Sequence, residues 1–170
     1  LKNQVTSGRW TSGKIVKIDT AKRMLYFEGH GQVEGGNPYY ARLNRVNLDG
    51  KGKVEVLTPE EGNHRVVFSP SGRYFVDTYS RPDLEPQSVL RDCAGQSMFV
   101  LEKSDLSKVY TKGWRKPECF TVKAADGKTD LYGVMWKPMD FDSTRRYPII
   151  TYVYPGPWTE YIPLNFEFVS

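Results

Sequence analysis

The stretch Arg65-Val-Val-Phe-Ser-Pro-Ser-Gly-Arg-Tyr-Phe-Val76 decides the fold of much of this 170-residue chain. Two runs rich in Val, Phe and Tyr, residues 65–68 and 74–76, lie on either side of Ser69–Gly72. Pro and Gly within such a segment favour a tight turn, and short runs rich in Val, Tyr and Phe favour strands. We therefore predict two antiparallel strands joined at Ser69–Gly72.

Two further strands complete a four-stranded unit. Residues 87–91 and 98–101 have the composition of strands, and Ala94-Gly95 marks the turn between them. The predicted unit spans residues 64–103.

The residues before this unit carry the same pattern. They contain four predicted strands, over residues 15–18, 24–27, 39–48 and 54–57. Ile15 and Arg65 begin the two units 50 residues apart, and the turn glycines Gly50 and Gly95 are 45 residues apart. The first unit spans residues 13–59.

Four short strands that recur at this spacing indicate blades of a β-propeller. One antiparallel sandwich of eight strands is the alternative on pattern alone. A propeller needs about four to eight blades, each buried against its neighbours, so we expect this chain to be part of a larger protein. Unpaired blade edges favour association, and we expect the isolated chain to pair with itself or to aggregate.

The pattern changes after residue 104. Residues 112–117 have the character of an interdomain link, and strands over 118–124 and 130–137 flank the hairpin dipeptide Asp126-Gly127. A polar loop then leads to Ile149–Tyr154, which is almost entirely apolar, β-branched or aromatic. Such a run predicts a strand that is buried on both faces.

The predicted strand ends at Pro155-Gly-Pro157. Pro155 cannot donate a ladder hydrogen bond, and Pro157 disfavours helical backbone at Gly156. Tyr154 is therefore expected at the carboxyl end of a buried strand, which is where open α/β sheets place their chemistry.

Charge and composition narrow the functional classes. The 24 Lys and Arg residues against 20 Asp and Glu residues give a net charge of +4. The basic residues are scattered apart from short clusters at 112–116 and 145–146, so we expect no nucleic-acid binding. No run approaches 18 apolar residues, and the chain begins with no charged-then-apolar leader, so no membrane span is expected.

Metal and cofactor sites are not expected either. His30, His64, Cys93 and Cys119 are far apart and lack metal-ligand spacing, and neither a P-loop nor a dinucleotide-binding glycine motif occurs. The two cysteines could form a disulfide or remain as two buried thiols.

The groups of a hydrolytic triad are missing. An α/β-hydrolase needs Gly-Xaa-Ser-Xaa-Gly, followed by Asp and then His. The nearest approach, Gly95–Phe99, lacks the second glycine and lies in a predicted hairpin. His30 and His64 precede the hydrolase-like strands, and we assign both to solvated loops or turns. Glu60-Glu61 follows Leu-Thr-Pro, and we assign this acidic pair to a turn between blades.

Four segments resemble the dipeptidyl peptidase IV branch of the prolyl oligopeptidase family: Gly72–Pro82, Glu118–Gly127, Leu131–Pro138 and Tyr147–Pro157. The resemblance runs through nearly the whole chain, and Val-Tyr-Xaa-Gly-Pro, here Val153–Pro157, is its most specific element. It implies a mainly β chain. Residues 1–111 would be the last propeller blades, 112–117 the linker, and 118–170 the incomplete start of an α/β-hydrolase domain.

The resemblance also implies a function for the parent protein. Members are serine exopeptidases that remove Xaa-Pro or Xaa-Ala dipeptides from peptide N-termini, and they need no cofactor. The Tyr of Val-Tyr-Xaa-Gly-Pro donates its hydroxyl to the oxyanion, a role that falls on Tyr154. No position here matches the family's acidic pair for the substrate amino terminus. The resemblance further implies a periplasmic or secreted parent that could be a homodimer.

Two other readings remain open at this point. The chain could belong to a non-enzymatic β-repeat binding module or to an inactive homologue, or it could be a self-contained all-β domain. A Gly-Xaa-Ser-Xaa-Gly after Ser170, followed by Asp and His, would favour the enzyme. Because the triad is missing, we predict that the 170-residue chain alone has no peptidase activity.

Overall fold

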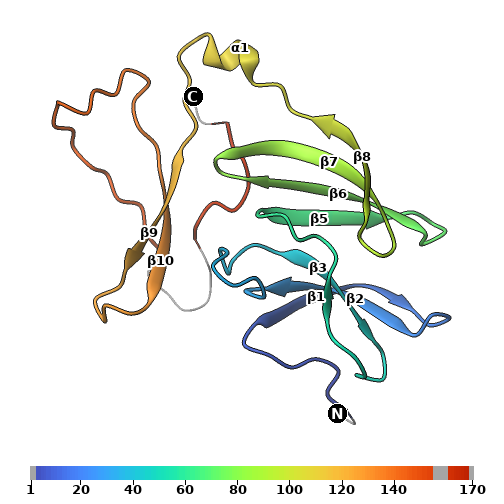
Figure 1. The fold of residues 1–170 in the computed structure, drawn as a ribbon. Coiled ribbons are helices and arrows are strands. Elements are labelled where there is room, and N and C mark those ends of the chain that lie inside the picture. The colour runs from blue at the N-terminus through green and yellow to red at the C-terminus, as the bar shows by residue number, and fades with distance from the viewer. Residues whose placement is uncertain (1–2, 155–160, 169–170) are drawn as a thin grey trace.

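The computed structural model describes residues 3–154 and 161–168. In this part of the chain two four-stranded antiparallel sheets lie against each other, and a two-stranded hairpin lies beside them (Figure 1). The first sheet consists of β1 (Thr11–Asp19), β2 (Met24–His30), β3 (Arg42–Asn47) and β4 (Glu55–Val56). The second consists of β5 (Asn63–Phe68), β6 (Tyr74–Arg81), β7 (Leu84–Asp92) and β8 (Ser97–Lys103).

Both sheets are simple meanders in which each strand pairs with the next along the chain. The eight strands coincide with the eight that the sequence predicts, so the internal repeat is confirmed. Several boundaries differ: β1 begins at Thr11 rather than at Ile15, β6 continues to Arg81 rather than ending at Val76, and β3 begins at Arg42 rather than at Tyr39. The amides of Tyr39 and Tyr40 donate to Asn37, to its side-chain and main-chain oxygens respectively, which holds these residues in a turn.

The turn at Ser69–Gly72 forms as predicted. The Gly72 amide donates to the Ser69 carbonyl at 2.9 Å. Gly72 has φ of +65°, a left-handed conformation that glycine adopts without a steric penalty.

The two sheets bury one face each against the other. Alternate residues of β6, namely Phe75, Asp77 and Tyr79, point into this interface and are almost fully buried. Phe75 packs with Tyr26, Leu43 and Leu57 of the first sheet in one hydrophobic cluster.

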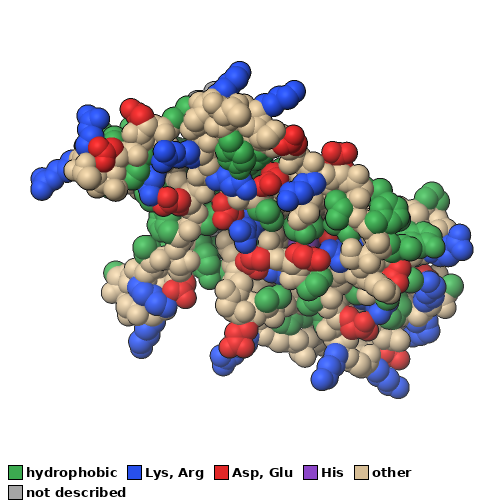
Figure 2. Space-filling view, turned by 45° about the horizontal axis from the view of Figure 1, so that its top comes forward, with side chains coloured by type: hydrophobic (Ala, Val, Ile, Leu, Met, Phe, Trp, Pro, Cys, Tyr) green, Lys and Arg blue, Asp and Glu red, His purple; other side chains and the backbone are tan. Residues whose placement is uncertain are grey.

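The opposite face of the second sheet is open. The strand register places Val67, Val76, Leu90 and Phe99 in one row across all four strands. Val67 is 63% exposed and Phe99 is 54% exposed. The outermost strand, β8, is exposed along its whole length. Figure 2 shows hydrophobic side chains gathered on the right of the molecular face, while acidic and basic side chains are interspersed over the rest.

The glycine at the β7–β8 turn lies very close to the first sheet. Gly95 has φ of +88°, and a Cβ atom built on it would lie 2.7 Å from the Leu57 carbonyl oxygen. Only a residue without a side chain fits this contact, so the turn and the end of the first sheet are closely packed.

The connection to the hairpin is anchored by an aromatic residue. A single helical turn, α1 (Ser107–Tyr110), follows the second sheet. Trp114, in the segment expected to be an interdomain link, is only 5% exposed. The hairpin itself, β9 (Glu118–Lys123) and β10 (Asp130–Met135), turns at Asp126-Gly127 as predicted.

Candidate functional site

The segment Ile149–Tyr154 does not form the buried strand that the sequence predicts. It is extended without ladder pairing, and Ile149 and Ile150 are 87% and 95% exposed. A buried strand needs neighbouring strands to complete its backbone hydrogen bonds. Among the described residues β9 and β10 pair with each other, and no strand pairs with Ile149–Tyr154. The prediction of a buried strand is therefore wrong for this structure.

Tyr154, the predicted oxyanion donor, is 59% exposed at the end of this segment. Its ring lies 5.9 Å from the ring of Tyr161. The Tyr161 hydroxyl lies 2.8 Å from that of Tyr152, and this hydrogen bond raises the pKa of Tyr161. The predicted Pro-Gly-Pro turn at 155–157 lies outside the described residues.

The chain beyond Tyr161 returns to the second sheet. The Asn63 side-chain amide donates to the Asn165 side-chain oxygen at 2.9 Å, and the Phe166 amide donates to the Ser80 hydroxyl at 3.1 Å. Phe166 also packs edge-on against Trp114, with ring centroids 5.8 Å apart. In Figure 1 this red segment runs between the hairpin and the ends of β5 and β6.

A cleft of about 260 Å³ lies where the hairpin meets the two sheets. Its polar lining includes Tyr40, Arg81, Asp83 and Cys119. Burial, followed by the proximity of Cys119, raises the pKa of Tyr40 to about 12. Burial and the Asp83 carboxylate raise the pKa of the Cys119 thiol to about 11.

The cleft therefore presents a neutral hydroxyl and a neutral thiol at ordinary pH. Arg81 and Asp83 form an ion pair at 2.8 Å, so each charge is already partnered. Glu61, also in the lining, binds the Arg42 guanidinium and accepts from the Asn37 amide at 2.8 Å. These groups can shape a junction between domains, but they supply neither a nucleophile nor a general base.

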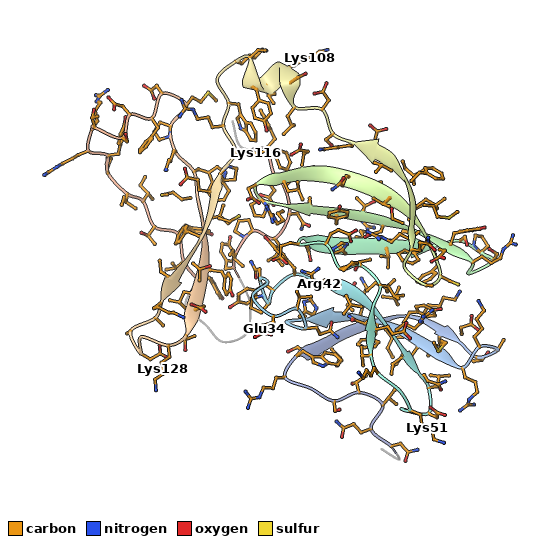
Figure 3. The ribbon with its side chains drawn as sticks, in the orientation of Figure 1. Glu34, Arg42, Lys51, Lys108, Lys116 and Lys128 are labelled. Atoms are coloured by element: carbon orange, nitrogen blue, oxygen red, sulfur yellow. The ribbon has the colours of Figure 1, made fainter. Side chains whose placement is uncertain are left out.

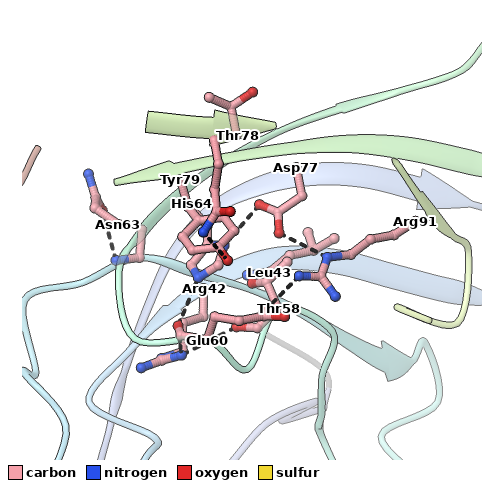
Figure 4. A network of polar contacts seen from close by, with 12 residues as sticks. Arg42, Leu43, Thr58, Glu60, Asn63, His64, Asp77, Thr78, Tyr79 and Arg91 are labelled. Atoms are coloured by element: carbon pink, nitrogen blue, oxygen red, sulfur yellow. Dashed lines mark hydrogen bonds and ion pairs between the residues drawn. The ribbon is translucent and has the colours of Figure 1, made fainter. Parts of the chain in front are cut away.

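His64 is buried, so its assignment to a solvated loop or turn is wrong. It is 5% exposed in β5, with Nδ1 2.8 Å from Asp77 Oδ1 and Nε2 2.9 Å from the Glu60 carbonyl oxygen (Figure 4). Its ring also stacks on Tyr79 at 4.7 Å. Both ring nitrogens are engaged by acceptors, so this His–Asp pair is structural and has no position for a serine.

The buried polar network extends to two arginines. Arg91 binds Asp77 at 2.9 Å and Glu60 at 2.7 Å. Burial, the largest single effect, would raise the pKa of Glu60, but its hydrogen bonds and the nearby charge of Arg91 together outweigh burial, and the pKa lies below its ordinary value. Arg42 pairs with Glu61 on the other side. The predicted turn at Glu60-Glu61 thus binds one arginine from each sheet.

Sequence reasoning did not identify this network. Asp77 lies on the same buried face of β6 as Phe75, two residues away. Arg91 lies on the same buried face of β7 as Val89. A charged residue at a position where the alternation of a strand predicts burial is the signal that could have identified Asp77 and Arg91.

His30 and the cysteines have no catalytic arrangement. His30 is the last residue of β2 and is half-buried, so its assignment to a solvated loop or turn is also wrong. Its Nδ1 lies 3.3 Å from the Tyr39 carbonyl oxygen. Both cysteines are free, Cys93 half-buried and Cys119 exposed, so they form neither a disulfide nor a pair of buried thiols. Gly95–Phe99 lies at the β7–β8 turn, as predicted.

Charged groups are dispersed over the surface. Lys51, Lys108 and Lys128 point outward from three separate ends of the molecule (Figure 3). Within residues 3–154 and 161–168, no group of three or more His, Cys, Asp or Glu side chains could hold a metal ion. No helix in this part of the chain is long and apolar enough to cross a membrane.

Comparison with known proteins gives a consistent result. The family described as the dipeptidyl peptidase IV (DPP IV) N-terminal region matches residues 1–86. Human dipeptidyl peptidase 8 is 25% identical over 184 residues, which cover 98% of this chain and 19% of the human protein. The probable dipeptidyl-aminopeptidase B of Emericella nidulans is 27% identical over 169 residues, covering 96% of this chain and 18% of the fungal protein.

Two crystal structures share the fold. Dipeptidyl peptidase 4 of Porphyromonas gingivalis superposes with a TM-score of 0.76 at 20% identity, covering 99% of this chain and 23% of that protein. A putative dipeptidyl aminopeptidase IV from Bacteroides ovatus superposes with a TM-score of 0.72 at 28% identity, covering 96% of this chain and 22% of that protein. The chain thus spans about a fifth of the length of these relatives.

The likeness confirms the predicted fold class: the chain is mainly β, and its two sheets are blades of a β-propeller rather than one sandwich. The assignment of residues 118–170 to an α/β-hydrolase domain stays a prediction. The resemblance seen in the sequence is confirmed, and the chain belongs to the family of the dipeptidyl peptidase IV N-terminal region.

Proposed function

We propose that this chain is the part of a serine-type dipeptidyl peptidase in which the last propeller blades join the catalytic domain. The family match over residues 1–86 carries the proposal. Residues 1–111 would form the propeller segment, 112–117 the linker and 118–170 the start of the catalytic domain. The whole protein would release N-terminal Xaa-Pro or Xaa-Ala dipeptides through a serine ester.

Tyr154 would stabilise the oxyanion of the tetrahedral intermediate. Such a donor must lie about 2.7–3.1 Å from the position that the developing negative charge will occupy. The exposed apolar run Ile149–Tyr154 supports this placement, because further strands of the whole protein would cover it and hold Tyr154 at the edge of a sheet. The serine, aspartate and histidine would come from outside these 170 residues.

Hydrolysis by the whole protein tests the proposal. Ala-Pro-p-nitroanilide should be cleaved, its N-acetylated form should not, and a serine-directed fluorophosphonate should abolish turnover. Absence of cleavage and of fluorophosphonate labelling would overturn the proposal in favour of a non-enzymatic binding module or an inactive homologue.

Self-association and export are further parts of the proposal. Within the part of the chain that the structure describes, β8 is an edge strand whose seven residues are exposed, which supports pairing of the isolated chain with itself. Sedimentation velocity over a concentration series tests this, since a monomer throughout would contradict it. We also propose that the whole protein is periplasmic or secreted and acts as a homodimer, which cell fractionation and the mass of the purified protein would check.

A further inference from the structure

Within the described segment 161–168, residues 165 and 166 make two polar contacts with the second sheet. Asn165 accepts a hydrogen bond from the Asn63 side chain at 2.9 Å, at the start of β5. The main-chain amide of Phe166 donates to the Ser80 hydroxyl at 3.1 Å, near the end of β6. Both contacts join residues more than 80 positions apart, so they fix one part of the chain against another.

Aromatic packing reinforces these contacts. Trp114 is 5% exposed, stacks on Phe168 at 5.5 Å and meets Phe166 edge-on at 5.8 Å. Trp114 lies in the link between the second sheet and the hairpin, so the same ring touches the link and the returning segment. A bulky ring in this position restricts how far the segment can shift.

The held segment is connected to the predicted donor by tyrosine rings. Tyr161 precedes Asn165 by four residues, and its ring lies 5.9 Å from that of Tyr154. Its hydroxyl also lies 2.8 Å from the Tyr152 hydroxyl. Fixing residues 165–168 therefore limits the position of Tyr161, and through it the position of Tyr154.

We propose that Ser80 and Asn165 are positioning residues for the oxyanion donor: the last propeller blade clamps residues 165–168 and thereby sets the location of the Tyr154 hydroxyl. The inference rests on the proposed function. It assigns the propeller a role in the chemical step, because a small misplacement of a catalytic group lowers the rate strongly.

Asn165 is a better target than its partner. The Asn63 side-chain oxygen also accepts from the Ala41 amide at 3.0 Å, so replacing Asn63 would disturb the contact between the two sheets as well. Asn165→Ala removes one contact and Ser80→Ala the other. Asn165→Asp keeps an acceptor for the Asn63 amide and Ser80→Thr keeps a hydroxyl, so these are the conservative variants. Ser97→Ala, on the exposed β8, is the matched control.

The experiment measures kcat and KM of the whole protein with Ala-Pro-p-nitroanilide for each variant, alone and combined with Tyr154→Phe. We expect Asn165→Ala and Ser80→Ala to lower kcat about tenfold at unchanged KM, with recovery in the conservative variants. In the Tyr154→Phe background the same changes should alter kcat less than about twofold, because the hydroxyl that they position is absent.

Other outcomes overturn the proposal and are distinguishable. An unchanged kcat in both variants, or an equal effect with and without the Tyr154 hydroxyl, refutes the positioning role and leaves the peptidase function intact. A loss that follows the folded fraction in a thermal melt, without recovery in the conservative variants, shows that the contacts only stabilise the fold. A wild-type protein without turnover removes the proposed function itself, and a Tyr154→Phe variant with full kcat refutes the assignment of Tyr154 as the oxyanion donor.

Discussion

The buried carboxylate of Asp77 should be one of the most sensitive single positions of the two sheets. It is 0% exposed and carries hydrogen bonds from His64 at 2.8 Å and from Arg91 at 2.9 Å. Asp77→Ala removes the partner of two buried groups at once. Breaking a buried pair by removing one partner costs about 3–5 kcal/mol, so we expect a loss of about 4 kcal/mol in the free energy of unfolding.

Asp83→Ala, in the turn between β6 and β7 of the same sheet, is the matched control. Asp83 pairs with Arg81 at a similar 2.8 Å, but the two side chains are 27% and 31% exposed. Exposed pairs contribute about 0–1 kcal/mol, so this variant should lose about 0.5 kcal/mol. With a urea slope of about 2 kcal/mol/M, the midpoint should fall by about 2 M for Asp77→Ala and by about 0.25 M for Asp83→Ala.

Urea titrations of the chain followed by far-UV circular dichroism would measure both midpoints. Asp77→Asn, which keeps an acceptor and the side-chain shape, should fall between the two. Midpoints of Asp77→Ala and Asp83→Ala that agree within about 0.5 M would refute the reasoning that burial makes this network essential.

Three further predictions concern the turn contact, the cleft thiol and the isolated chain. Gly95→Ala should lower the free energy of unfolding by about 3 kcal/mol, because the new side chain meets both a left-handed backbone and the Leu57 main chain. Gly52 has φ of +94° but open space around it, so Gly52→Ala should lower the free energy of unfolding by only about 1 kcal/mol. Equal urea midpoints for the two variants would contradict this. The pKa of Cys119 is raised to about 11, so the neutral thiol prevails below that pH and its alkylation rate should rise about tenfold per pH unit from pH 7 to pH 10. Asp83→Asn should lower the pKa of Cys119 and speed its alkylation at pH 8. Mass spectrometry of iodoacetamide adducts would measure these rates, and a pH-independent rate of Cys119 alkylation would contradict the reasoning. The purified 170-residue chain should not cleave Ala-Pro-p-nitroanilide, and turnover resistant to mutation of Tyr154 would contradict both this and the family-based function.

Local signals were sufficient for most of the fold. Alternation and turn residues located all eight strands of the two sheets, because hairpin meanders depend on neighbouring segments. The turn at Ser69–Gly72 was predictable from Pro and Gly alone, and Gly72 indeed has a left-handed backbone.

Contacts between distant segments were not predictable in this way. The pairing of Asp77 with His64 and Arg91 depends on how two sheets stack, and composition alone places a histidine after Gly-Asn in a solvated turn. The contacts of Asn165 and Phe166 with the second sheet likewise join parts of the chain with no shared local pattern.

At Ile149–Tyr154 the local sequence signal is strong, but the predicted strand does not form. Its composition favours burial on both faces, but burial requires neighbouring strands, and the described chain provides none for it. The same residues fit a sheet edge in a larger protein, which is the arrangement that the proposed function requires.

The most direct test of that function is the kcat of the whole protein after Tyr154→Phe. Removing the hydroxyl alone should lower kcat with Ala-Pro-p-nitroanilide by roughly 10²- to 10³-fold with little change in KM, as expected for loss of one oxyanion donor. A kcat equal to that of the wild type would show that Tyr154 is structural and would contradict its assignment as the oxyanion donor.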